Sequence, residues 1–366
     1  MKVLDIPISE INNYIEDGFI YFWGAGKALE PYVNTLIHYV SLGKIKAIVD
    51  SKIKGKRNYR SNSFSIISPE EFLNEINEKD LLIITTDYYE EIIDKLRKEV
   101  TADTISACVY KYTIKTEKDK VRDGIMLPKS IRNEANQMIP KIIHYCWFGN
   151  NPIPGRHKKC IDSWNYYCPD YEIKCWDESN YDVNKIEYMK QAYSLKKWAF
   201  VSDYARLDII YNYGGIYLDT DVELLKNIDD FLYNKSFCGF ETSDYVAFGL
   251  GFGSVKHNEI IRDIMKIYEE SNFENSDGTL NETTCPIIQT KILEKRGLIR
   301  NGQYQIVDGM VVMPEWALCP LSVWTRKNTA RISEAFMYHH FAASWDKNAD
   351  SGVRKLTHFY QDIVDS

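Results

Sequence analysis

The chain has 366 residues and a formal net charge of −7, and 45% of its residues are hydrophobic. This length predicts about two to three domains, and the apolar content is sufficient for sizeable cores. The negative charge argues against a nucleic-acid partner, because such partners are bound by clustered basic residues.

Eight cysteines are scattered along the chain, with no C-x-x-C pair and no paired Cys/His spacing of the kind that holds zinc. They are typical of reduced, mostly buried thiols, which favours a cytoplasmic protein. We expect no signal peptide, because the N-terminal residues form no long apolar segment. We also expect no membrane-spanning helix, since no run of about 18 apolar residues occurs. Peripheral association with the inner face of a membrane stays open.

Residues 1–115 alternate between predicted strands and helices, which indicates a parallel sheet with helices on its faces. The predicted strands lie at 19–23, 45–49, 81–85 and 105–109, and the predicted helices at 28–41, from Pro69, and at 88–98. We therefore predict a small Rossmann-like domain over this range.

A glycine motif follows the first predicted strand. Gly24-Ala-Gly26 stands after that strand and Asp50 ends the second, a pattern typical of one half of a dinucleotide-binding fold. The third glycine of that pattern is absent, because Leu29 occupies its place. Two interpretations stay open: nucleotide binding, or glycines kept for tight packing between strand and helix.

The next segment, Lys111 to Gln137, is polar, carries charges of both signs and has little periodicity. We predict a linker over residues 116–138. A second αβ unit follows, which we assign to a domain over residues 139–366. Its predicted strands lie at 140–149, 171–176, 216–218, 237–241, 248–254, 311–313 and 335–340, and its predicted helices at 156–167, 184–193, 196–213, 259–270 and 283–295.

Two carboxylates follow the short apolar strand at 216–218. Asp219 and Asp221 can face one ligand, because residues i and i+2 of an extended backbone point to the same side. Two hard oxygen donors at a strand end suit Mg²⁺ or Mn²⁺ carrying a diphosphate. A surface turn rich in Asp is the alternative. A phosphatase of the haloacid dehalogenase type is disfavoured, because it requires Thr or Val where this chain has Glu223.

The helix before this strand carries a charged pair among apolar residues. Asp203 and Arg206 are spaced i, i+3 and therefore share a face. An exposed pair of this kind contributes only a few tenths of a kcal/mol, on the order of 0.3–0.5. A buried pair requires a polar partner, and a sugar diphosphate would supply one.

Three blocks of this region, taken together, resemble the family 32 glycosyltransferases, the sugar transferases of capsular polysaccharide and yeast mannan synthesis. The blocks are Pro140–Gly149, Ser202–Arg206 and Gly214–Asp221. The same set is similar to the glucosylating domain of large clostridial toxins. The resemblance covers residues 139 to 346 and leaves the N-terminal module outside. It implies an α/β GT-A fold, a nucleotide-sugar donor, a divalent metal, and retention of the anomeric configuration.

The resemblance also implies roles for individual residues. Trp147 would stack on the donor base, and Asp203 and Arg206 would hold hydroxyls of the donor sugar. Tyr217 would lie near the sugar phosphate. Asp219 would contact the ribose, and the metal through water, while Asp221 would bind the metal directly.

The segment 335–345 resembles the closing His…Ser-Trp element of the same family. A histidine here would complete the metal shell, and Ser344 and Trp345 would cover the leaving group. Strand alternation allows only one of His339 and His340 to face the site, and we favour His339.

We therefore predict a metal-dependent, retaining hexosyltransferase with Mn²⁺ or Mg²⁺ as cofactor. The predicted donor is a nucleotide sugar, with uridine diphosphate favoured over guanosine diphosphate. The predicted acceptor is a saccharide or lipid-linked saccharide in bacterial surface polysaccharide synthesis. The alternative is a non-catalytic nucleotide- or sugar-binding sensor module. No residue stands out as a nucleophile.

The glycine-rich segment Phe248–Gly253 is either an approach for the acceptor or a bulged strand, and Trp316 and Trp324 are either acceptor platforms or core. A homo-oligomer stays open.

Overall fold

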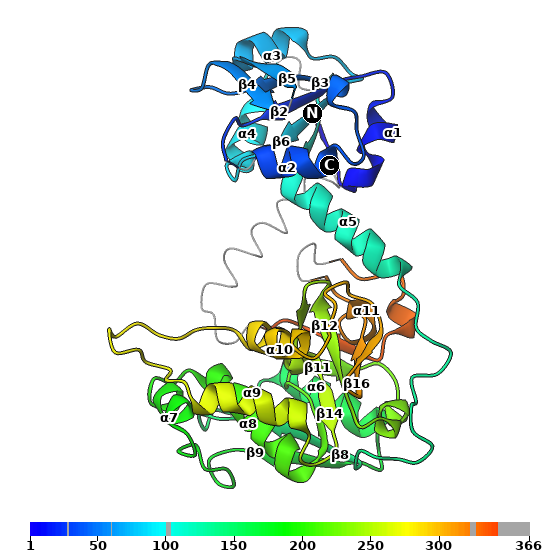
Figure 1. The fold of residues 1–366 in the computed structure, drawn as a ribbon, viewed down its shortest axis with the longest axis vertical. Coiled ribbons are helices and arrows are strands. Elements are labelled where there is room, and N and C mark those ends of the chain that lie inside the picture. Colours follow the sequence, from blue (N-terminus) through cyan, green and yellow to red (C-terminus); the bar gives the residue numbers. More distant parts are fainter. Residues whose placement is uncertain (28, 60, 100–103, 323–326, 343–366) are drawn as a thin grey trace. The chain divides into compact units, whose positions relative to one another are not determined.

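A computed structural model describes residues 1–27, 29–59, 61–99, 104–322 and 327–342. The chain divides into two compact units between Val121 and Arg122 (Figure 1). We call residues 1–121 the first unit and the described residues from 122 onward the second unit. The predicted contributions of Trp324, Ser344 and Trp345 lie outside the described residues.

The first unit contains a seven-stranded sheet in the order β1-β7-β6-β2-β3-β5-β4. Neighbouring strands are parallel except for the antiparallel hairpin of β4 and β5. Every residue of β2, β6 and β7 is buried, as expected for a parallel sheet covered on both faces. The strands are β1 Lys2–Val3, β2 Ile20–Trp23, β3 Ile45–Val49, β4 Gly55–Tyr59, β5 Asn62–Ile67, β6 Leu81–Ile84 and β7 Ser106–Val109; the helices are α1 Ile11–Ile15, α2 Leu29–Leu36, α3 Pro69–Glu75 and α4 Tyr89–Leu96.

The glycine motif lies in the loop after β2, beside the end of β3. The Asp50 carboxylate accepts hydrogen bonds from the backbone N–H groups of Ala25 (3.0 Å), Lys52 (2.8 Å) and Ile53 (2.9 Å). Although burial alone would raise it, these N–H groups hold the pKa of Asp50 below its ordinary value. The carboxylate that a dinucleotide site would offer to ribose is thus bound to the loop backbone, which favours the packing interpretation.

Helix α5 (Tyr110–Gly124) occupies the start of the segment that we predicted to be irregular. That local prediction is wrong up to Gly124. Long-range contacts hold the last turn of the helix, and the local sequence does not reveal them. Arg122 forms a buried ion pair with Glu315 (3.4 Å), and the Asp123 carboxylate accepts hydrogen bonds from the Thr329 hydroxyl (2.5 Å) and the Ala330 N–H (3.1 Å).

The second unit is built on a mixed sheet whose main path runs β15-β16-β12-β14-β10-β8-β9, with β13 paired to β12, and on a separate ladder of β11 with β17. The α/β class predicted from the sequence is therefore confirmed. The strands are β8 Ile142–Cys146, β9 Glu172–Trp176, β10 Gly215–Tyr217, β11 Val222–Leu224, β12 Ser236–Thr242, β13 Tyr245–Val246, β14 Phe252–Ser254, β15 Gln305–Val307, β16 Met310–Met313 and β17 Met337–His339; the helices are α6 Gly155–Tyr167, α7 Glu187–Ser194, α8 Trp198–Tyr213, α9 Glu259–Glu269, α10 Cys285–Glu294 and α11 Glu315–Leu318.

Helices cover both faces of this sheet and enclose two hydrophobic cores. One core contains residues of α7, α8, α9 and α10, and Figure 1 shows α8 and α9 side by side. The other core contains residues of α6, α11 and the β11–β17 ladder. Trp316 lies in this second core, is fully buried and donates to the carbonyl of Ile125 (3.0 Å), so it is not an acceptor platform. No described helix combines the length and apolarity needed to cross a bilayer.

Candidate active site

Strand β10 brings the chain into the site and lies between β8 and β14. Gly215 has φ +105°, and a Cβ here would lie 2.8 Å from the Ile142 carbonyl oxygen, so only glycine fits. His144 supports this turn from β8. Trp176 donates to its Nδ1 (3.0 Å), so Nε2 carries the proton and donates to the Gly214 carbonyl (2.9 Å). Burial lowers the pKa of His144 to about 4, which keeps it neutral.

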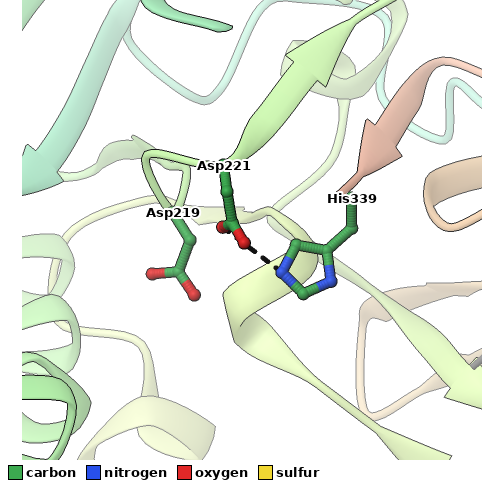
Figure 2. A group of neighbouring side chains, drawn as sticks. All are labelled: Asp219, Asp221 and His339. Carbon is green, nitrogen blue, oxygen red and sulfur yellow. Dashed lines mark ion pairs between the residues drawn. The ribbon is translucent and has the colours of Figure 1, made fainter. Parts of the chain in front are cut away.

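The residues that follow β10 meet a strand from much later in the chain. Val222 of β11 pairs with His339 of β17. This register places the imidazole beside the preceding carboxylate, with His339 Nε2 3.4 Å from Asp221 Oδ1. One oxygen or nitrogen atom from each of Asp219, Asp221 and His339 lies within 4.8 Å of the others, and Figure 2 shows the three side chains gathered at one point. His340 instead contacts Glu223 (2.9 Å).

The pKa values of Asp219, Asp221 and His339 are shifted in different directions. Burial alone would raise the pKa of Asp221, but the neighbouring His339 and the Ala342 N–H, which donates at 2.8 Å, hold it well below its ordinary value. Burial would lower the pKa of His339, and the carboxylate of Asp221 raises it. Burial raises the pKa of Asp219 despite the nearby guanidinium of Arg206. Asp221 is thus the most firmly ionised member of the group.

Arg206 joins this group to the preceding helix α8. Its guanidinium lies 3.2 Å from Asp219 Oδ1 and 3.3 Å from Asp203 Oδ1, and its Nε donates to the Ser202 carbonyl (3.1 Å). It also covers the ring of Tyr217 at 5.1 Å. Burial raises the pKa of Asp203 to about 6, although Arg206 opposes this shift. The i, i+3 pair predicted from the sequence is therefore a buried pair with a third partner, Asp219.

The remaining predicted residues, Tyr217 and Trp147, differ in how far they are buried. Tyr217 is buried beneath Arg206, and its burial, together with the neighbouring Cys146 and Asp219, raises its pKa. Trp147 is half-buried just past the end of β8, donates to the Asn151 carbonyl (2.6 Å) and lies 5.5 Å from the His157 ring. Trp147 therefore has an exposed surface on which a base could stack, whereas Tyr217 supports its charged neighbours.

Sequence reasoning missed several residues of the site, because each comes from a distant segment. A Cβ on Gly249 would lie 2.5 Å from Asp219 Oδ2. The Nδ1 atom of His157, on α6, lies 2.9 Å from the hydroxyl of Thr220, between the two aspartates. Glu241 on β12 and Cys285 at the start of α10 also belong to this neighbourhood. Gly249 lies in the glycine-rich segment Phe248–Gly253 noted from the sequence, but its approach to Asp219 was not predicted, and the other three residues stand in no local motif.

The donor atoms fit a divalent cation. Two carboxylates and one imidazole form the set, and His339 Nδ1 is buried without a partner among the described residues. Ligands on opposite sides of a small divalent ion lie about 4 Å apart, so small shifts would bring all three onto one ion. Carboxylates suit Mg²⁺ and Mn²⁺, and the imidazole favours Mn²⁺ over Mg²⁺.

Residues 154–238 match a family model described as "Glycosyltransferase sugar-binding region containing DXD motif". Asp203, Arg206, Asp219 and Asp221 all lie within the matched segment. The comparisons support a glycosyltransferase.

Curated relatives each match about a quarter to a third or slightly more of the chain. Inositol phosphoceramide mannosyltransferase 3 of Schizosaccharomyces pombe is 36% identical over 131 residues, which is 32% of this chain and 34% of that protein. Mannosyl phosphorylinositol ceramide synthase SUR1 of Saccharomyces cerevisiae is 30% identical over 148 residues, 37% of this chain and 35% of that protein. The uncharacterized glycosyltransferase L373 of Acanthamoeba polyphaga mimivirus is 36% identical over 105 residues, 26% of this chain and 40% of that protein.

The chain thus spans only 34% to 40% of the length of these relatives. They are yeast and viral proteins, and none of their names mentions a capsular polysaccharide. Among solved structures, the PaToxG glycosyltransferase aligns with a TM-score of 0.32 and 16% identity, over 48% of this chain and 73% of that chain. A TM-score this low supports no conclusion.

Proposed function

We propose that the chain is a metal-dependent, retaining glycosyltransferase that moves a sugar from a nucleotide-sugar donor to a saccharide or lipid-linked saccharide. One observation carries the proposal. Asp219, Asp221 and His339 converge within 4.8 Å at the end of β10. The two aspartates lie inside the segment that matches the DXD family model, and the histidine comes from β17. A surface turn rich in Asp would not bring in a histidine from β17.

Asp221 and His339 would hold the cation, with Asp219 beside them. A cation bound there would neutralise the charge that develops on the departing nucleoside diphosphate. Asp221 suits this role because it stays ionised over the whole physiological pH range. Arg206 keeps the nearby Asp219 in place through their 3.2 Å contact.

The other predicted residues would position the donor. Asp203 would accept hydrogen bonds from hydroxyls of the donor sugar, and the buried Arg206 fixes the direction of its carboxylate. Trp147 would stack on the base with its exposed face. Retention by same-face attack requires few protein groups: the bond from the anomeric carbon to the phosphate oxygen breaks, the acceptor oxygen bonds on the same side, and the acceptor's proton passes to the departing phosphate.

The choice of sugar and acceptor is the finer part of the proposal. The resemblance favours a uridine diphosphate donor and a bacterial surface polysaccharide as product. The yeast relatives are instead named for mannose transfer to inositol phosphoceramide. We therefore propose that donors be screened as both UDP-sugars and GDP-mannose, and acceptors as both oligosaccharides and inositol phospholipids. We retain a cytoplasmic location, with peripheral binding at the inner face of the membrane.

The test combines a thermal-shift screen with donor hydrolysis, each with and without Mn²⁺. A true donor must stabilise the folded state, by an amount that grows with the logarithm of its concentration relative to its Kd. The Asp221→Asn variant should lose the stabilisation by Mn²⁺ and the hydrolysis of the donor, whereas Asp162→Asn, an exposed control on α6, should keep both. Unchanged turnover of Asp221→Asn with Mn²⁺ present would refute the metal assignment. Donor binding by the native chain without hydrolysis or transfer would support the sensor alternative.

A further inference from the structure

Glu241 is held in an unusual position at the end of β12. In the hairpin with β13, Phe240 pairs with Val246 and Thr242 pairs with Tyr245. Glu241 is therefore an extra residue of β12 that has no paired residue on β13. Such a β-bulge redirects a side chain and is common beside active sites. Phe240 and Thr242 are buried, whereas Glu241 between them is half-exposed. At the bulge, the side chain of Glu241 is therefore partly exposed between two buried neighbours.

The Glu241 carboxylate has no hydrogen-bond or ion-pair partner in the described part of the chain. The other three carboxylates of the site are all paired: Asp221 with His339, and both Asp203 and Asp219 with Arg206. Glu241 also lies outside the group whose atoms share a mutual 4.8 Å spacing, so it is not placed as a further metal ligand. A partly buried carboxylate without a partner lowers stability, which indicates that its charge serves another purpose.

Glu241 is close enough to both ends of the site for its charge to act on each of them. Its charge acts on His339 and Asp219 at the metal end. It also acts on the thiol of Cys285, which lies near Asp203 at the predicted sugar end. The anomeric carbon of a nucleotide sugar would likewise be close to both ends, because it joins the diphosphate to the sugar ring.

We propose that Glu241 is a catalytic carboxylate that faces the anomeric carbon of the bound donor and stabilises the positive charge that develops there. This inference rests on the proposed glycosyltransferase function. Glu241 forms no covalent bond in this step and acts in its carboxylate form, although burial raises its pKa. The electron pair of the breaking bond leaves with the diphosphate, the acceptor oxygen bonds the anomeric carbon, and the acceptor's proton goes to the leaving phosphate. Glu241 thus provides the negative charge that an oxocarbenium-like transition state requires.

The test is the Glu241→Gln variant, which keeps the shape of the side chain and removes its charge. We expect its kcat for donor hydrolysis and transfer to fall by about 100-fold or more. The KM for the donor should stay unchanged, the Kd for Mn²⁺ should change far less than kcat, and Tm should not fall, since no contact is lost. Glu223→Gln is the matched control, because this carboxylate lies on the neighbouring β11, contacts His340 and should leave kcat unchanged.

Glu241→Asp is the second variant and retains the charge on a shorter side chain. It should recover part of the activity lost in Glu241→Gln. A Glu241→Gln variant with native kcat, a loss of Mn²⁺ affinity as large as the expected loss of kcat, a lowered Tm, or equal impairment of the Asp and Gln variants would each overturn the assignment. If the native chain processes no donor in the panel, the proposed function fails and this inference fails with it. An active native chain with an unaffected Glu241→Gln variant overturns the inference alone.

Discussion

The Gly249→Ala substitution tests how closely the site depends on the position of Asp219. The backbone of Gly249 does not have a positive φ, so alanine is not excluded by conformation. The obstacle is space, because the new Cβ would lie 2.5 Å from Asp219 Oδ2 and 3.1 Å from a terminal nitrogen of Arg206. Ordinary contact begins at 3.4 Å, so the carboxylate must withdraw by 0.9 Å, the difference between 3.4 and 2.5 Å.

A displacement of about 1 Å in a positioned catalytic group can lower the rate by about 100-fold. We therefore expect Gly249→Ala to weaken Mn²⁺ binding and to reduce kcat/KM for the donor by about 100-fold. Stability should change little, because Asp219 is partly exposed and can move toward solvent. Isothermal titration with Mn²⁺, donor hydrolysis and thermal unfolding measure the three quantities.

The control is Gly155→Ala at the start of α6, where a Cβ would have no neighbour within 4 Å and φ is not positive. This variant should behave as the native chain. Native Mn²⁺ affinity and native activity in Gly249→Ala would show that Asp219 tolerates displacement, and the metal and ribose roles assigned to it would be wrong. A large loss of stability would mean that the clash is relieved by the backbone instead.

Three further predictions concern the histidines and the cation. His339→Ala should weaken Mn²⁺ binding at least about tenfold, whereas His340→Ala, which removes only the contact with Glu223, should leave it unchanged by titration. The pKa of His144 is lowered to about 4 in the folded chain and is about 6.5 when unfolded, so the unfolded state binds more protons between these values. Its contribution to the free energy of unfolding is therefore complete above pH 6.5 and falls by about 2 kcal/mol at pH 5; urea unfolding at pH 7 and pH 5 should show this loss in the native chain and not in His144→Gln. Finally, Mn²⁺ at 100 times its Kd should stabilise the native chain by about 2.7 kcal/mol, reversed by a chelator and absent in Asp221→Asn; equal stabilisation of the variant would place the ion elsewhere.

Local patterns predicted much of the fold. The alternation of apolar strands and helices in the first unit, and helix α8 with its Asp203–Arg206 pair, depend on neighbours within a few residues. Helix α5 was missed because its sequence is polar and its last turn is held by residues some 200 positions away, including Glu315 and Thr329. The hairpin of β4 and β5 was missed because β4 is polar and largely exposed, and the alternation in β5 is limited to Phe64 and Ile66 among polar residues.

In the candidate site, too, local patterns predicted some residues and missed those whose positions depend on long-range contacts. Asp219 and Asp221 follow a strand in a recognisable order, so their position was predictable from the residues themselves. The positions of Glu241 and Gly249 depend instead on strand pairing and on loop packing over long distances. A bulge is a relation between two strands, and a close approach of Gly249 to Asp219 is a relation between two loops. Neither the bulge at Glu241 nor the approach of Gly249 to Asp219 can be predicted from the adjacent residues alone.

The pairing of β11 with β17 has a consequence for the order in which the molecule matures. More than one hundred residues of nascent chain separate the two aspartates from His339, whose pairing with Val222 completes the group. During synthesis, the aspartates emerge from the ribosome long before the histidine. A partly synthesised chain therefore contains only two of the three proposed metal ligands. Under the proposed metal assignment, cation binding would follow the synthesis of β17, and a chain truncated before β17 would carry the aspartates without the histidine.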